Sequence, residues 1–233
     1  MPTDASFVPF DPELVNFIRR ILSVAETDEP VWDPSAVYKY NDGPGKTPQW
    51  TLSVGFTEMG GNLKVVIERY LELGGSLAVQ FAPYLAVMGK KHITDPEFKT
   101  LLQQAGKEPA MEQAQAEIFD EKYLGPAFAW AKRYGFTKPL SFLVIADSFL
   151  HSGSMLPFLM DRFPEKKPVD GGNEEVWIKA YLRERREWLA THSSTILRAT
   201  VYRAECYLEQ IKKDNWSLAA APVNMHGTGV LPA

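Results

Sequence analysis

The first periodic segment of the chain has hydrophobic residues at helical spacing. They stand at i, i+3, i+4, i+7 and i+8: Leu14, Phe17, Ile18, Ile21 and Leu22. This spacing gives one apolar face to an amphipathic helix. Asp11 suits the N-cap and Pro12 suits the first helical position. The pattern predicts a helix over residues 11–25, with Glu26 at its C-terminal end.

The next segment changes from helical to extended character. Residues 27–49 are rich in proline, and Asn41-Asp42-Gly43 with Gly45 is typical of a turn. Residues 50–56, which begin at Trp50, are rich in β-forming side chains and predict a strand. We therefore expect a small antiparallel sheet between Tyr38 and Phe56.

The rest of the chain predicts helices joined by short connections. The predicted spans are 63–73, 76–88, 96–105, 111–119, 127–134, 140–151, 173–191 and 194–213. We expect a break at Gly125-Pro126, and residues 140–151, nearly all apolar, predict the central buried helix. We expect no regular secondary structure in the tail after Trp216. The fold class is therefore mainly α (α+β), with one small β element in the first third.

Composition indicates an ordinary globular protein. The chain has 233 residues, of which 45% are hydrophobic and 23% are charged. Its single cysteine excludes an intramolecular disulfide, and no apolar run predicts a membrane span. The N-terminal sequence lacks the basic and apolar regions of a secretory signal. We expect a cytoplasmic protein or one released without a signal, unless a signal was removed from a secreted protein.

The negative charge is concentrated in one segment. The net charge is −4, and residues 22–62 alone carry six acids against Lys39 and Lys46. A negative field in one place disfavours nucleic acid as a partner and is compatible with a cationic ligand, although a solvated acidic loop remains an equal interpretation. We expect neither nucleic acid nor membrane partners, and a monomer.

Two carboxyl groups in this segment suit acid–base chemistry. Glu26 follows a helix, whose C-terminal carbonyls disfavour ionisation and so favour a protonated acid. Asp42 lies among the amides of the turn, where a carboxylate stays ionised. Glycosidic cleavage needs one carboxyl group of each kind. With many acids in the chain, this pair alone remains weak evidence.

The order of these elements resembles that of the lysozyme-like superfamily, and within it the family 46 glycoside hydrolases, the chitosanases. That family has a Glu at the end of its first helix, a Tyr-containing segment and then Asp-Gly-x-Gly-x-Thr. Here the segment reads Tyr38-Lys39-Tyr40, followed by Asp42-Gly43-Pro44-Gly45-Lys46-Thr47. Farther on, ADSFLHSG and GGNEEVWIKAYLRERRE are similar to later helices of the family. The resemblance runs from about residue 14 to the end.

The resemblance implies a two-lobed fold with a cleft between the lobes, in a single glycoside hydrolase domain over residues 1–233. The catalytic stretch would be 26–62 and the helical body 63–213. The enzyme would be endo-acting and would cleave β-1,4 linkages of an amino-sugar polymer, chitosan above all, by an inverting mechanism.

The resemblance also implies a role for individual residues. Glu26 would be the general acid, Asp42 the general base, and Thr47 would hold the attacking water. Asp147 and Arg185 would form a buried structural ion pair. The residues expected to bind substrate are Tyr38, Trp50 and Asn62, with a core role equally open for Trp50.

Two positions depart from the family pattern and leave the substrate open. Pro44 replaces a basic residue of the turn, and Asn62 replaces an acidic sugar-binding residue. One alternative is therefore a muramidase that cleaves peptidoglycan. Another is a catalytically inactive sugar-binding module in which the carboxyl pair is only structural.

Other chemistries find less support. The four histidines show no metal-ligand spacing, so we expect no metal, and no motif indicates a cofactor. Ser152-Gly153-Ser154 lacks the nucleophile elbow of serine hydrolases. His151 ends the apolar helix, where a satisfied core histidine is the simpler interpretation.

Overall fold

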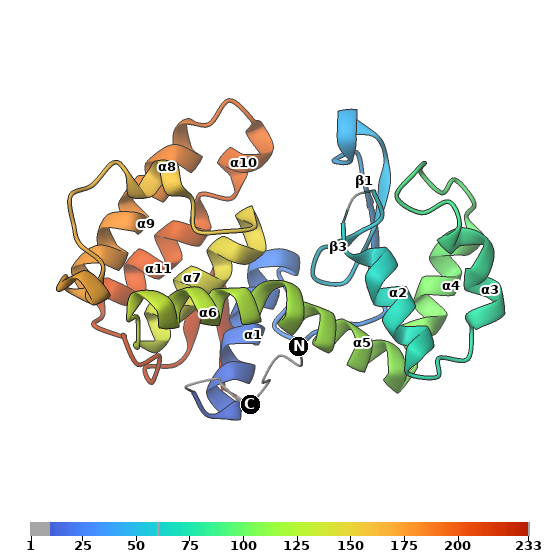
Figure 1. The fold of residues 1–233 in the computed structure, drawn as a ribbon, viewed down its shortest axis with the longest axis horizontal. Coiled ribbons are helices and arrows are strands. Elements are labelled where there is room, and N and C mark those ends of the chain that lie inside the picture. The colour runs from blue at the N-terminus through green and yellow to red at the C-terminus, as the bar shows by residue number, and fades with distance from the viewer. Residues whose placement is uncertain (1–9, 60, 233) are drawn as a thin grey trace. The chain divides into compact units, whose positions relative to one another are not determined.

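The computed structural model describes residues 10–59 and 61–232. The chain forms two compact units: unit 1 is Met1–Pro30 with Tyr123–Ala233, and unit 2 is Val31–Lys122. No helix within the described residues has both the length and the apolar character needed to cross a membrane. The fold is mainly α with a small antiparallel sheet, as the sequence predicts (Figure 1).

Unit 1 begins with the predicted amphipathic helix, α1 (Pro12–Thr27). The Asp11 carboxylate accepts a hydrogen bond of 2.8 Å from the backbone N–H of Leu14, as an N-cap does. Asp28 caps the end of this helix with a left-handed backbone (φ 61°), and its N–H donates to the carbonyl of Val24. Glu26 therefore lies in the last turn of α1.

The other elements of unit 1 pack around one apolar helix, α7 (Pro139–Ser152), in which every residue from Leu140 to Ser148 is buried. Helix α7 contacts α1 and three other helices of this unit, which confirms it as the central helix. Burial on all sides explains why it lacks a polar face. The remaining elements of unit 1 are α6 (Gly125–Tyr134), α8 (Pro157–Met160), the 3₁₀ turn η3 (Pro168–Asp170), α9 (Glu174–Thr191), α10 (Thr195–Ala199), α11 (Tyr202–Lys212), β4 (Val223–Met225) and β5 (Thr228–Val230).

Unit 2 contains the predicted sheet, whose three strands pair in chain order and are antiparallel. The predicted strand over residues 50–56 is two strands, because Ser53 (φ 47°) and Gly55 (φ 89°) turn the chain. The elements of unit 2 are β1 (Val37–Tyr40), the 3₁₀ turn η1 (Pro44–Lys46), β2 (Gln49–Leu52), β3 (Phe56–Thr57), α2 (Leu63–Glu72), α3 (Ala78–Leu85), α4 (Glu97–Ala105) and α5 (Pro109–Phe119).

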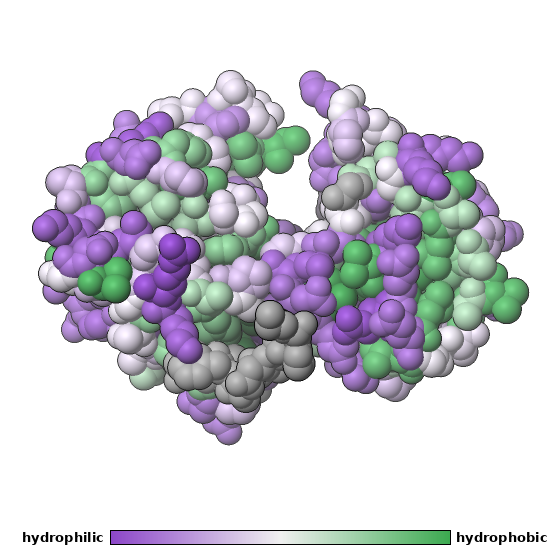
Figure 2. Space-filling view, in the orientation of Figure 1, coloured by the Kyte–Doolittle hydropathy of each residue, from purple (hydrophilic) through white to green (hydrophobic). Residues whose placement is uncertain are grey.

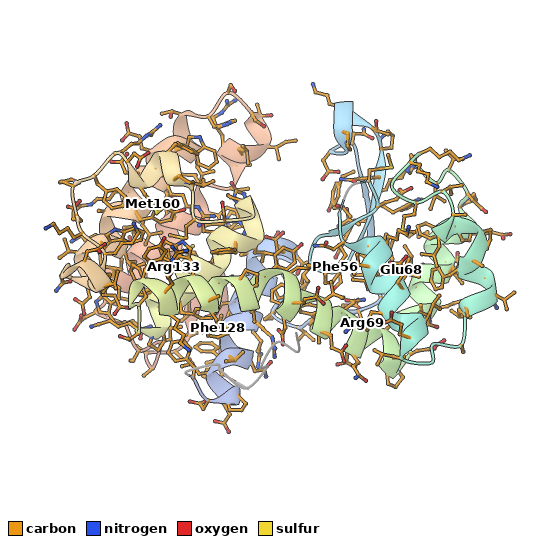
Figure 3. The ribbon with its side chains drawn as sticks, viewed as in Figure 1. Phe56, Glu68, Arg69, Phe128, Arg133 and Met160 are labelled. Atoms are coloured by element: carbon orange, nitrogen blue, oxygen red, sulfur yellow. The ribbon has the colours of Figure 1, made fainter. Side chains whose placement is uncertain are left out.

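Helices α2 and α5 pack side by side in unit 2 (Figure 1). Arg69 of α2, labelled in Figure 3, donates to Glu117 of α5 at 2.5 Å, and Phe56 of β3 is fully buried where β3 lies against α2. Hydrophobic side chains reach the surface of this unit near α3, where Val79 is 84% exposed (Figure 2). The sheet that carries Asp42 is therefore backed by a packed helical body.

Three further expectations from the sequence were wrong. The expected break at Gly125-Pro126 is absent, because a π-helical segment, η2 (Asp120–Leu124), runs directly into α6 and accommodates the proline near its start. The helix expected over 194–213 is interrupted between α10 and α11. The tail contains a hairpin, β4–β5, turned at His226 (φ 52°) and Gly227 (φ 92°), two positive-φ positions that close a tight hairpin.

Candidate active site

Glu26 is held by an arginine that the sequence did not single out. The guanidinium of Arg203, in α11, makes an ion pair with Glu26 through Nη2, and the same nitrogen donates to the carbonyl of Ala25 at 2.7 Å. The hydroxyl of Tyr202 also donates to this carbonyl at 2.7 Å. The Glu26 side chain is 20% exposed while that of Arg203 is 3% exposed, so the carboxyl group reaches solvent and its partner does not.

Arg203 links Glu26 to a buried carboxylate. Its Nη1 donates to Oδ1 of Asp147 at 2.8 Å, and Arg185 donates to Oδ2 of Asp147 at 2.6 Å. Asp147 and Arg185 are fully buried, at the positions for which the sequence analysis expected a pair. Burial raises the pKa of Asp147, but the charges of Arg185 and Arg203 outweigh it and lower the pKa to about 2.

The charges of this cluster depend on Glu26. When Glu26 is ionised, two carboxylates balance two guanidinium groups, and when it is protonated the cluster carries one net positive charge. A neighbouring guanidinium favours the ionised form of a carboxyl group. Arg203 therefore places a positive charge directly against the Glu26 carboxyl group. Burial lowers the pKa of Arg203, but the charges of Glu26 and Asp147 outweigh this effect and raise the pKa above its ordinary value.

His151 lies in the field of the same cluster. Burial lowers the pKa of its imidazole, the charges of Arg203 and Arg185 lower it further, and Asp147 opposes them, giving a pKa of about 4. Its Nδ1 is 3.3 Å from the hydroxyl of Ser152. His151 is thus a neutral, half-buried histidine at neutral pH, and it does not belong to the fully buried core.

Asp42 stands on the glycine turn of unit 2 and is exposed. Nε2 of Gln49 donates to Oδ1 of Asp42 at 2.9 Å. The backbone N–H of Gly43 donates to the carbonyl of Thr47 at 3.0 Å and closes the turn. A Cβ at Gly43 would lie 2.7 Å from that carbonyl oxygen, so only glycine fits there. The turn thus presents a carboxylate to solvent and braces one of its oxygens.

Thr47 follows this turn and is partly exposed. Its hydroxyl donates to the carbonyl of Pro44 at 2.7 Å, so the oxygen keeps lone pairs that accept from a water molecule. The structure therefore joins Asp42 and Thr47 on one short turn, with the hydroxyl oriented by the backbone.

The residues expected to bind substrate differ in exposure. Tyr38 of β1 is partly exposed and stacks on Tyr40, whose ring centroid is 6.0 Å away. Asn62 stands at the N-cap position of α2 but makes no side-chain capping hydrogen bond. Trp50 is 7% exposed and donates its indole N–H to the carbonyl of Ile93 at 2.9 Å. The expectation of Trp50 as a sugar platform is corrected, because the structure gives it the core role.

The predicted residues fall into two groups. Glu26, Asp147 and Arg185 belong to unit 1, whereas Asp42, Thr47, Tyr38 and Asn62 belong to unit 2. The residues that sequence reasoning missed are Arg203 and Gln49. Arg203 had a signal, since it shares the buried face of α11 with Tyr207 and Gln210 at spacings of four and three.

The described residues contain no group of three or more His, Cys, Asp or Glu side chains suited to holding a metal ion. One histidine, His92, instead places Nδ1 2.9 Å from Oε2 of Glu58, which also accepts from the backbone N–H of Trp50 at 3.1 Å. Glu58 is 1% exposed, so this acid of the 22–62 segment serves the interior of unit 2 and does not face a ligand.

Two comparisons with known proteins give matches, one to a family model and one to solved structures. A model of glycosyl hydrolase family 46 matches residues 20–223. The native chitosanase of Bacillus subtilis MY002 superposes with a TM-score of 0.81 at 20% identity, covering 94% of this chain and 98% of that one. The family 46 chitosanase of Gynuella sunshinyii, in complex with chitotetraose, gives 0.81 at 22% identity, with 96% and 99% covered. These likenesses show the fold. No curated protein matches the chain.

Proposed function

The chain belongs to glycosyl hydrolase family 46, and we propose that it is an endo-acting chitosanase that cleaves β-1,4 linkages by an inverting mechanism. Its enzyme class, a glycosidase, follows from the family. The substrate and the roles of the residues are our proposals. We also propose that residues 1–233 make one glycoside hydrolase domain, with a catalytic stretch at 26–62 and a helical body at 63–213.

Glu26 is the proposed general acid. In this reaction a carboxylic acid gives its proton to the glycosidic oxygen and becomes a carboxylate in the transition state. Arg203 is already in contact with Glu26, so its positive charge stabilises the carboxylate as it forms. Asp147, which shares Arg203 with Glu26, and Arg185 hold this guanidinium in place. The cluster thereby favours proton transfer from Glu26 in the direction that cleavage requires.

Asp42 is the proposed general base. Inverting enzymes use a second carboxylate to activate water on the opposite face of the sugar, with the two carboxyl groups about 6.5–9.5 Å apart in that class. The exposed carboxylate of Asp42 and the hydroxyl of Thr47 stand on one turn, which suits them to take a proton from a water and to orient it. This turn is the single observation that carries the proposed mechanism most directly.

The substrate proposal rests on charge. Chitosan carries free amino groups, so it is a cationic polymer that acidic side chains attract. Asp28, Glu29, Asp33 and Asp42 of the acidic segment are exposed. The solved relatives support the same class, since one is a complex with chitotetraose and a variant from Bacillus subtilis MY002 is complexed with 6 GlcN. An amino-sugar polymer is therefore the substrate we propose.

A reducing-end assay on chitosan, chitin and peptidoglycan in parallel tests the proposal. We expect release of reducing ends from chitosan, and a loss of about 10²–10⁴-fold in Glu26→Gln and Asp42→Asn, the range that acid–base groups contribute. Glu68→Gln, at an exposed carboxylate of α2, is the matched control and should keep full activity.

The same assay separates the alternatives. Cleavage of peptidoglycan alone would identify a muramidase and overturn the substrate proposal. Binding of chito-oligomers without any reducing ends would identify an inactive sugar-binding module. Normal chitosan digestion by both carboxyl variants would overturn the assigned roles.

A further inference from the structure

Gln49 lies between the proposed general base and the backbone of the sheet. It is the first residue of β2 and is 4% exposed. Its Nε2 donates to Oδ1 of Asp42 at 2.9 Å, and its Oε1 accepts from the backbone N–H of Met59 at 3.0 Å. One buried amide therefore makes two hydrogen bonds, one to a carboxylate through its nitrogen and one to the main chain through its oxygen.

The orientation of this amide is fixed by chemistry. The backbone N–H of Met59 is a donor only, so the oxygen of the Gln49 amide must face it and the nitrogen must face Asp42. Asp42 then receives a donor from Gln49 whenever the carboxylate is ionised. The opposite amide orientation would leave two donors facing each other.

The frame around Gln49 is also constrained. The backbone N–H of Glu58 donates to the carbonyl of Trp50 at 2.9 Å, and the Glu58 carboxylate accepts from the N–H of Trp50 at 3.1 Å. These bonds fix residue 58 against residue 50, and so fix Met59 opposite Gln49. Side-chain oxygens thus continue the β2–β3 pairing beyond its last backbone hydrogen bond. The sheet therefore determines where Gln49 lies.

We propose that Gln49 is the positioning residue of Asp42: its amide occupies one carboxylate oxygen and leaves the other, Oδ2, to take the proton from the attacking water. This inference rests on the proposed function, because it assigns Asp42 as the base. Gln49 is buried beneath the turn and acts through Asp42. It should therefore affect the chemical step and its pH dependence rather than the binding of the polymer.

Gln49→Glu tests the proposal by changing one end of the contact. The new side chain keeps an oxygen for the N–H of Met59 and places a second carboxyl group beside Asp42. When the pair shares a proton, the hydrogen bond to Asp42 persists, and when both groups ionise they repel each other. We expect the alkaline limb of the kcat profile to move to lower pH, with kcat lowered about ten- to hundredfold at neutral pH and KM nearly unchanged.

Gln115→Glu is the matched control. Gln115 is another buried glutamine of unit 2. It accepts a hydrogen bond from Trp32 and donates one to the carbonyl of Pro34, and neither of these bonds involves Asp42. Its variant reports the general cost of burying a carboxylate, so the thermal midpoint should fall while the shape of the pH profile stays that of the wild type. A pH profile and kcat of Gln49→Glu that superpose on those of the wild type would overturn the proposal.

A second measurement avoids substitution at Gln49. In the wild-type protein, the side-chain amide protons of Gln49 should shift in NMR spectra as Asp42 titrates, and Asp42→Asn should abolish that shift. Amide signals that do not respond to pH would contradict the contact. Retained activity in Asp42→Asn would overturn the proposed function itself. An inactive Asp42→Asn together with unchanged Gln49→Glu kinetics would overturn only the role of Gln49.

Discussion

Arg203 makes an ion pair with Glu26 from a guanidinium that is almost entirely buried, while the carboxyl group of Glu26 remains within reach of solvent. The arrangement puts a fixed positive charge beside the group proposed to lose a proton. Because Arg203 is also bound to Asp147, its position does not depend on Glu26 alone. The charge is therefore in place before the proton leaves, and no reorganisation is needed at that moment.

Replacing Arg203 should cost both stability and activity. Arg203→Ala leaves the buried carboxylate of Asp147 with one partner in place of two, and breaking a buried ion pair typically costs about 3–5 kcal/mol. Urea denaturation measures this cost. Arg186→Ala is the matched control, since its pair with Glu205 is exposed and should be worth no more than about 1 kcal/mol. Equal losses in the two variants would contradict the account.

Arg203→Lys separates charge from geometry. A lysine keeps the positive charge but lacks the planar fork that reaches Glu26, Ala25 and Asp147 together. We expect a folded protein with strongly reduced kcat, measured by release of reducing ends. Full activity in this variant would show that charge alone suffices.

His151 should make stability depend on pH. Its pKa is lowered from 6.5 to about 4 in the fold, so the unfolded chain binds the proton first as the pH falls. The stabilisation is therefore fully present above pH 6.5 and is lost progressively down to about pH 4. Thermal midpoints at pH 7 and pH 4.5 should differ less in His151→Gln than in the wild type. An unchanged pH difference in His151→Gln would refute the assignment.

Asp147 should affect the stability of the fold at still lower pH. Its pKa is lowered from 3.8 to about 2, so the stability it contributes is complete above pH 3.8 and is lost as the pH falls toward 2. The two groups therefore act in separate pH windows. A His151 variant should keep the part of acid unfolding that lies below pH 3.8.

Gly43 should tolerate no side chain. A Cβ there would lie 2.7 Å from the carbonyl oxygen of Thr47, so Gly43→Ala must open the turn that carries Asp42 and Thr47. We expect a fall in kcat of about 10²-fold, the cost of small misplacements of catalytic groups. A Cβ at Gly45 (φ 67°) would meet no atom within 4 Å. Gly45→Asn is therefore the control and should lose much less activity, because asparagine accepts this backbone conformation.

The contribution of Thr47 to kcat should depend on its hydroxyl group alone. Thr47→Ser keeps a hydroxyl that can donate to the carbonyl of Pro44 and accept from water, whereas Thr47→Val keeps only the shape. We expect kcat near that of the wild type in Thr47→Ser and a fall of at least about tenfold in Thr47→Val. Equal kcat values in the two variants would remove Thr47 from the mechanism.

The sequence predicted those parts of the fold that depend on local periodicity. The apolar face of α1 with its Asp11 cap, and the uniformly apolar α7, need only neighbouring residues to be recognised. The hairpin of the tail was missed because its strands are three residues each and its turn has His226 before Gly227, in place of the Asn or Asp that usually signals such a turn. The Gly125-Pro126 break was expected from local rules, which a π-helical segment overrides.

The candidate site also contains residues that the sequence predicted and residues that it did not. Glu26, Asp42 and Thr47 were found through a motif, which is local in sequence. Arg203 is 177 positions from Glu26 and Gln49 acts through an amide, so neither contact has a local signature. Only the fold brings α11 beside the end of α1, and only the sheet register places Gln49 where it reaches Asp42. Polar contacts that depend on helix packing or on strand register are the part that sequence patterns do not specify.

The anomer released first distinguishes an inverting from a retaining reaction. If Glu26 protonates the leaving oxygen and Asp42 activates a water on the opposite face, hydrolysis of a β-1,4-linked glucosamine oligomer must invert the reacting carbon. Proton NMR spectra recorded in the first minutes of the reaction should show the α-anomer of the new reducing end, before mutarotation mixes the two forms. Initial appearance of the β-anomer would contradict the mechanism, whatever the activity of the variants.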